Sequence, residues 1–125
     1  MSYINKRNEY INVNGLKIAY REINKGKSEK PLVMLVHLAA TMDNWDPKFI
    51  DLVAEKHHII LLDLPGVGGS EGKIATTIPG MAQQAIDIIK ELGYSKINLL
   101  GLSMGGMIAQ EVTRLNNDLV EKLIL

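Results

Sequence analysis

The fold is decided by the stretch Ile97-Asn98-Leu99-Leu100-Gly101-Leu102-Ser103-Met104-Gly105-Gly106-Met107. It predicts a buried strand, then a Gly-x-Ser-x-Gly turn, then a helix that begins at once. A serine at such a corner adopts a strained backbone with φ near about +60° and projects its hydroxyl from the carboxyl end of the sheet. Gly101 and Gly105 flank Ser103 at positions where a Cβ would collide with neighbouring backbone. We therefore interpret Ser103 as a candidate nucleophile.

The backbone amide of Met104 is the first candidate partner of that nucleophile. It lies in the first turn of the helix, where N–H groups lack internal partners and the helix dipole favours negative charge. The sequence thus predicts a site that holds an oxyanion. A short Gly-x-Ser-x-Gly run also occurs in flexible structural turns, which is the alternative interpretation. The spacings of a P-loop and of a dinucleotide-binding fingerprint are absent from the sequence.

Composition excludes several classes of function. The chain has 125 residues, 14 basic and 14 acidic side chains, and no cysteine. This length predicts one domain, residues 1–125. The charge balance argues against nucleic-acid and membrane partners, and the lack of cysteine excludes disulfides and thiolate metal sites. We expect no metal, no cofactor and a cytoplasmic location.

Alternating strand and helix signals follow one another along the chain. Asn14-Gly15 joins two alternating runs within residues 9–23 and predicts a hairpin. Asp46-Pro47 predicts the start of a helix. Further predicted elements are strands at 32–36, 59–62 and 119–125, a helix that buries Phe49, Ile50 and Val53, and a helix near 81–92 that ends at Gly93. The predicted fold is α/β, a mostly parallel sheet with helices on both faces and an N-terminal antiparallel hairpin.

Four segments in this order resemble the α/β-hydrolase superfamily. They are the hairpin Tyr10 to Ile23, the run Leu35-Val36-His37, the loop Asp63-Leu64-Pro65-Gly66-Val67-Gly68-Gly69-Ser70, and the turn Gly101-Leu102-Ser103-Met104-Gly105-Gly106. The resemblance implies a partial α/β-hydrolase fold with Ser103 as nucleophile. It implies oxyanion-hole donors at the backbone N–H groups of Met104 and Ala39, with Leu38 where the family commonly has glycine.

His37 and Trp45 each have two possible roles. The counterpart of His37 in the family is a structural histidine that shapes its loop, and the other interpretation of His37 is a general base near the serine. His37, Leu38 and Trp45 are possible pocket residues, although Trp45 also suits the core. Asp63 is expected to accept amide hydrogen bonds from the loop Gly66–Gly69, and His57 and His58 to lie at the opposite, amino-terminal edge of the sheet.

The order of a hydrolase triad is Ser, then Asp or Glu, then His. The resemblance places both later residues beyond Leu125, so we expect residues 1–125 to be an N-terminal portion whose C-terminal portion is absent. Such a chain is expected to be nearly inactive alone. The expected parent is an esterase-like hydrolase of small-molecule esters or related acyl or carbon–carbon bonds. A cofactor-free haloperoxidase-type activity would use the same residues.

A second class of function is a non-catalytic polypeptide that assembles with a complementary chain. The strand at 119–125 supports it, because an unpaired outer edge is prone to self-association or to pairing with the missing half.

Overall fold

The computed structural model describes residues 3, 6–35 and 41–125. Its sheet has six strands in the order β1-β2-β4-β3-β5-β6. The hairpin β1–β2 and the pair β2–β4 are antiparallel, and the remaining pairs are parallel. This confirms the predicted α/β class. The strands are β1 (Glu9–Val13), β2 (Leu16–Ile23), β3 (Leu32–Leu35), β4 (Ile59–Leu62), β5 (Ile97–Gly101) and β6 (Val120–Ile124).

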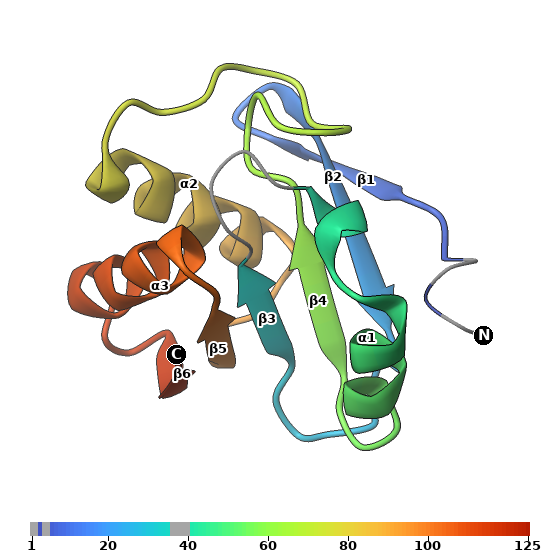
Figure 1. Cartoon of the computed structure of the whole chain (residues 1–125). Helices are drawn as coiled ribbons and strands as arrows, with labels where there is room; N and C mark the ends of the chain where they lie inside the picture. Colours follow the sequence, from blue (N-terminus) through green and yellow to red (C-terminus); the bar gives the residue numbers. More distant parts are fainter. Residues whose placement is uncertain (1–2, 4–5, 36–40) are drawn as a thin grey trace.

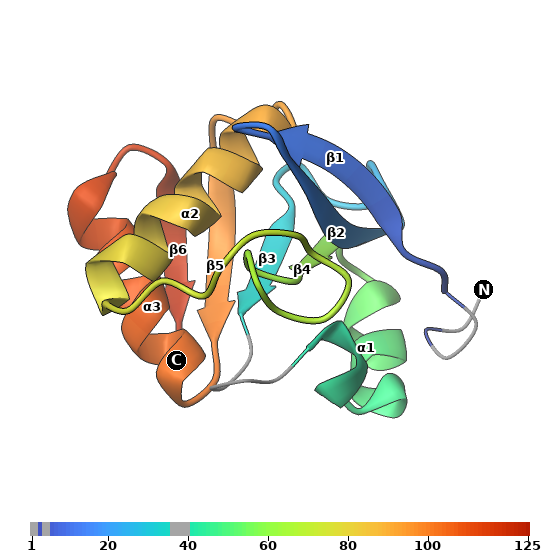
Figure 2. The same ribbon diagram turned by 90° about the horizontal axis from the view of Figure 1, so that it is seen from above.

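Helices cover both faces of this sheet. In Figure 1, α2 and α3 lie together on one side and α1 lies on the other, and the view from above in Figure 2 shows the same three layers. None of the described helices is both long and apolar enough to cross a membrane. The helices are α1 (Pro47–Ala54), α2 (Ile78–Glu91), α3 (Met104–Leu115) and the short 3-10 helix η2 (Met42–Asn44).

The hairpin turn follows the sequence prediction. Asn14 and Gly15 have φ of 52° and 84°, the positive values that a tight hairpin turn requires at both central residues. Gly93, with φ of 96°, ends α2 as predicted.

The helix α1 begins as predicted, but Phe49 is not among the residues that it buries. The carboxylate of Asp46 accepts from the Lys48 N–H at 2.9 Å and Pro47 is the first helical residue. Ile50 is fully buried, whereas Phe49 is 41% exposed. The prediction that Phe49 is buried was therefore wrong. Ile50 and Ala54, four residues apart, face the sheet. Phe49 therefore points away from the sheet core, and its ring stacks on Trp45.

Two hydrophobic cores follow from the layers. Successive side chains of β2 and of β5 point to opposite faces of the sheet, so they enter the two cores alternately. The core under α2 and α3 includes Ile18, Val33, Ile89, Leu99 and Val112. The core under α1 includes Ala19, Met34, Trp45, Ile50 and Leu61.

The last strand forms one edge of the sheet. β6 pairs with β5 on one side, and only its first residue, Val120, is buried. Leu123, Ile124 and Leu125 are 36%, 46% and 68% exposed. An apolar strand edge therefore lies open in the described chain, as the sequence predicts.

Candidate active site

Ser103 lies at the corner between β5 and α3, which we call the Ser103 corner (Gly101–Gly106). Its backbone has φ of 58° and ψ of −119°, which confirms the predicted positive φ. Among the described residues, the other non-glycine residues with positive φ are Asn14 and Asn24, and asparagine tolerates that region. Such strain costs about 1–3 kcal/mol and concentrates at functional sites. The geometry therefore favours a functional over a merely structural serine.

The corner is possible because β5 and α3 approach each other backbone to backbone. A Cβ at Gly101 would meet the carbonyl group of Gly105 and would lie 2.6 Å from the Cα of Gly106. Real Cβ atoms essentially never come so close, so residue 101 has to be glycine for the helix to begin here. The steric reason given for Gly101 from the sequence is confirmed.

The hydroxyl of Ser103 is not used to cap its own helix. Ser103 occupies the N-cap position of α3 but makes no side-chain capping hydrogen bond. The other N-cap residues described here, Thr41, Asp46 and Thr77, each accept a backbone N–H through their side chain. Ser103 is exposed. The usual structural explanation of a serine at a helix start does not apply at this position.

The first amides of α3 supply hydrogen-bond donors beside this serine. Gly105 N–H donates to Leu102 O at 2.9 Å and Gly106 N–H donates to Ser103 O at 2.9 Å. Within the described part of the chain, the Met104 N–H donates to no acceptor. An amide at a helix N-terminus suits an oxyanion, because the aligned peptide dipoles favour negative charge there.

A backbone hydrogen bond ties the corner to the neighbouring strand. Leu102 N–H donates to the carbonyl oxygen of Leu35, the last residue of β3, at 3.0 Å. Ser103 is thereby fixed at the carboxyl edge of the sheet. The predicted site residues His37, Leu38 and Ala39 follow Leu35 and lie outside the described residues, so the roles given to them from the sequence stay predictions.

Asp63, which follows β4, organises two loops at the same edge. It is 3% exposed, and its carboxylate accepts the N–H of Gly69 at 3.0 Å, as predicted. It also accepts the N–H of Met42 at 2.9 Å, a partner that the sequence did not indicate. A Cβ at Gly68 would lie 2.8 Å from the Asp63 carboxylate carbon, which explains the glycine there.

Trp45 belongs to the core under α1. It is 7% exposed and packs with Met42 and Ile50, and its ring stacks on Phe49 with centroids 6.3 Å apart. Of the two alternatives for Trp45, the structure places it in the core.

The two described histidines lie far from Ser103 along the strands. His57 is exposed, whereas His58 is 3% exposed and its Nε2 lies 2.6 Å from Glu22 Oε2. The hydroxyl of Tyr94 donates to the same carboxylate oxygen. Burial, and then this hydrogen bond, raise the pKa of Tyr94 above its ordinary value. This cluster of the buried His58 with the half-buried Glu22 and Tyr94 was not predicted. The described residues contain no cluster of three or more His, Asp or Glu side chains that would hold a metal.

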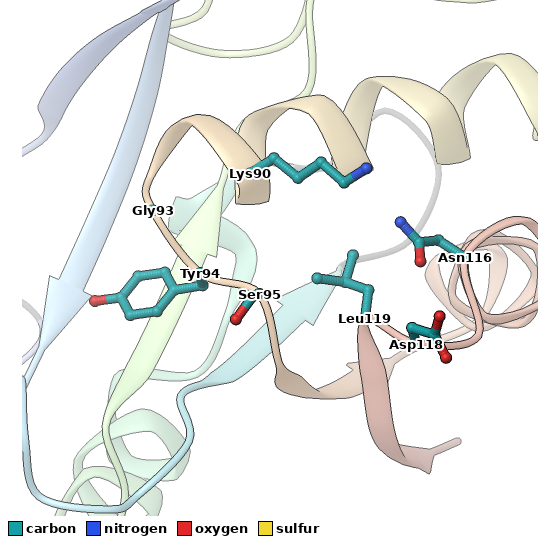
Figure 3. Close-up of a pocket in the computed structure, with 7 residues that line it drawn as sticks. All are labelled: Lys90, Gly93, Tyr94, Ser95, Asn116, Asp118 and Leu119. Atoms are coloured by element: carbon teal, nitrogen blue, oxygen red, sulfur yellow. The ribbon is translucent and has the colours of Figure 1, made fainter.

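A hollow of about 470 Å³ lies at the amino edge as well. Its walls come from the end of α2 and the segment between α3 and β6, and Figure 3 shows the Lys90 side chain extending toward Asn116 across it. Ser95 and Leu119 line it just before β5 and β6 begin. Because Ser103 follows β5, this hollow and the Ser103 corner are at opposite ends of the strands.

Known proteins are similar to this chain in sequence and in structure. A putative esterase/lipase of Haemophilus influenzae is 35% identical over 96 residues, which are 76% of this chain and 33% of that protein. A soluble epoxide hydrolase of Corynebacterium is 31% identical over 114 residues, 90% of this chain and 38% of that protein. The chain spans only about a third of the length of these curated relatives.

Solved structures and a family model agree with these relatives. An alpha/beta hydrolase fold protein from Chitinophaga pinensis superposes with a TM-score of 0.94 at 32% identity, and the match covers 98% of this chain and 44% of that one. The model of the alpha/beta hydrolase fold family matches residues 30–125, which include the Ser103 corner. The chain therefore belongs to the alpha/beta hydrolase fold family.

Proposed function

We propose that this chain carries the nucleophile of a hydrolase that cleaves small-molecule esters or related acyl or carbon–carbon bonds. The observation that carries the proposal is the strained backbone of Ser103 at the start of α3, with a hydroxyl that does not cap the helix. Relatives named as esterase/lipase and as epoxide hydrolase support a hydrolytic reaction.

In the proposed reaction, the Ser103 Oγ attacks a carbonyl carbon and a general base takes the hydroxyl proton. The carbonyl π electrons move onto oxygen, and the N–H groups of Met104 and Ala39 hold the resulting oxyanion. Collapse of this intermediate breaks the bond to the leaving group, which takes up the proton, and water then hydrolyses the acyl-serine. One oxyanion donor of this kind lowers the barrier by about 3 kcal/mol.

The described histidines do not supply the base. His58 is buried against Glu22 at the amino edge, and His57 precedes it. Losing the base of a serine triad lowers the rate by several orders of magnitude, and the oxyanion hole alone retains only residual catalysis. We therefore propose that Ser103 reacts slowly in residues 1–125 alone.

Site-resolved labelling with a fluorophosphonate tests this function. In the folded chain, we expect slow modification at Ser103 that is about a hundredfold faster than in the urea-unfolded chain, because only the folded corner offers oxyanion donors. Ser103→Ala should abolish it. Ser95→Ala, at the opposite end of β5, should leave it unchanged.

Two results would count against the proposal in different ways. Equal labelling of Ser103 in the folded and unfolded chain would mean that the corner provides no oxyanion site. Rapid, stoichiometric labelling would mean that a base lies within this chain, and the proposed slow reaction would be wrong.

The open edge of β6 favours a second candidate function, which is assembly with a complementary polypeptide or with another copy. Leu123, Ile124 and Leu125 are all more than a third exposed, and an apolar strand edge is a template for pairing. This proposal is compatible with the first one, because a partner at this edge would also complete the sheet that holds Ser103.

A further inference from the structure

A buried arginine lies on β2, on the sheet face that α1 covers. Arg21 is 8% exposed, and all three of its nitrogen atoms find acceptors. Nε donates to Asn8 Oδ1 at 2.9 Å, Nη1 to the Tyr3 hydroxyl at 3.0 Å, and Nη2 to Asp43 Oδ1 at 2.8 Å. A buried guanidinium is stable only when it is satisfied in this way.

Two of the three partners of Arg21, Tyr3 and Asp43, lead to one short segment, the 3-10 helix η2. Asp43 belongs to η2 itself, and the hydroxyl of Tyr3 donates to the carbonyl oxygen of Met42. The N–H of Met42 is held from the other side by the buried Asp63 at 2.9 Å. Both backbone polar groups of Met42 are therefore bound to side chains from other parts of the fold.

The positive charge of Arg21 strengthens its hydrogen bond to the Asp43 carboxylate. Burial alone would lower the pKa of Arg21, but the hydrogen bonds to Asp43 and Tyr3 raise it above its ordinary value. The guanidinium therefore stays charged. Its Cζ atom also lies 5.3 Å from the centre of the Tyr3 ring, within cation–π range. An apolar residue of similar size would fill the same space without linking these segments.

The 3-10 helix η2 is bonded to the carboxyl edge of the sheet, where Ser103 also lies. Asp63 follows β4, and the Ser103 corner follows β5 at the same carboxyl edge. The corner is bonded to the end of β3 through Leu102 and Leu35. Leu35 is thus bonded to the corner, and Met42 is bonded to Asp63 and to Tyr3, which Arg21 holds in turn.

We propose that Arg21 is a positioning residue for the reaction of Ser103, because it holds η2 at a fixed place relative to the Ser103 corner through Tyr3 and Asp43. This inference rests on the proposed function. Arg21 acts through other groups and touches no reacting atom.

Hydrogen exchange and fluorophosphonate labelling of the full chain test it together. In Arg21→Met, the Met42 N–H keeps its acceptor Asp63, but η2 loses the links through Tyr3 and Asp43 that hold it against this acceptor. The Met42 amide should therefore exchange at least about tenfold faster. The Leu61 amide in β4 should change less than about twofold, since the sheet stays folded. Labelling of Ser103 should slow about tenfold, the effect of a mispositioned site.

Three further variants make the test specific. Tyr3→Phe keeps the ring but removes the link to Met42, and it should reproduce the faster Met42 exchange even if Arg21→Met folds poorly. Arg21→Lys keeps the positive charge but loses the planar guanidinium with its several donors. Its labelling rate should therefore lie between those of Arg21→Met and the wild type. Arg114→Met, whose arginine pairs with Glu111 on the surface of α3, should change neither readout.

The proposal is overturned if Met42 exchange is unchanged, or if Leu61 exchange rises as much as that of Met42, which would indicate general destabilisation. It is equally overturned if Met42 loosens while Ser103 labelling stays at the wild-type rate. Should wild-type labelling fall elsewhere than on Ser103, the proposed function fails, and Met42 exchange alone still decides whether Arg21 holds η2.

Discussion

Gly101 and Gly105 lie so close that a Cβ on Gly101 would meet the carbonyl group of Gly105. This contact brings the first turn of α3 directly onto the end of β5 and leaves Ser103 with φ of 58°. The position of the candidate nucleophile therefore depends on the absence of a side chain two residues earlier.

Gly101→Ala should destabilise the fold and displace the corner. The added methyl group has no space, and overpacking of this kind costs about 1–3 kcal/mol. Urea unfolding measures the loss. Gly106→Ala is the matched control, since a Cβ there would lie 3.4 Å from the nearest atom, an ordinary contact. Equal stability of the two variants would show that the close approach is not real.

Ser103→Gly should be more stable than Ser103→Ala. Both variants lose the hydroxyl, but only glycine relieves the strained backbone, which is worth about 1 kcal/mol once the added flexibility of the unfolded chain is subtracted. The difference in the free energy of unfolding between these two variants isolates the strain. An alanine variant as stable as the glycine variant would mean that residue 103 is unstrained.

Stability should fall above about pH 10 because of Tyr94. Burial and the hydrogen bond to Glu22 raise the pKa of Tyr94 above its ordinary value of 10.0. The unfolded chain therefore ionises first, and the contribution of Tyr94 is fully present below that ordinary pKa and is lost as the pH rises toward the folded value. Unfolding free energies measured at about pH 9 and pH 11 test this.

Tyr94→Phe should reduce that pH dependence, and the raised pKa values of Tyr3 and Tyr20 should leave a smaller slope. Tyr10→Phe is the control, because Tyr10 is 49% exposed, and it should keep the wild-type slope. A slope that Tyr94→Phe leaves unchanged would show that the alkaline loss of stability comes from other groups.

The edge of β6 should make the chain associate as its concentration rises. Each fully exposed leucine forgoes roughly 1.5–3 kcal/mol of burial, and three apolar side chains stand open at this edge. Ile124→Lys should weaken association in light scattering. Ile74→Lys, in a loop where Ile74 is 53% exposed, should not. A monodisperse monomer at all concentrations would contradict the proposed assembly.

Local sequence signals predicted the elements that carry strong periodicity or turn chemistry. Asn14-Gly15, Asp46-Pro47 and the Ser103 corner all formed as expected, because each depends on a few adjacent residues. Phe49 was misplaced because the face that α1 buries is set by packing against the sheet, which a short helix does not encode by itself.

The long-range polar networks were not predicted. Arg21 meets Asp43, and Glu22 meets His58 and Tyr94, over large separations along the chain. A signal for Arg21 was present, because the alternation of β2 puts it on the same inner face as the buried Ala19. Its partners come from segments whose proximity only the folded sheet establishes.

A crystal structure of the chain after reaction with a fluorophosphonate tests most directly whether the Ser103 corner is an oxyanion-binding nucleophile site. We predict a covalent bond between Ser103 Oγ and phosphorus, with a phosphonyl oxygen about 2.7–3.1 Å from the Met104 backbone nitrogen. An adduct on another residue, or a phosphonyl oxygen directed into solvent away from the Met104 N–H, would contradict the proposed role of this corner.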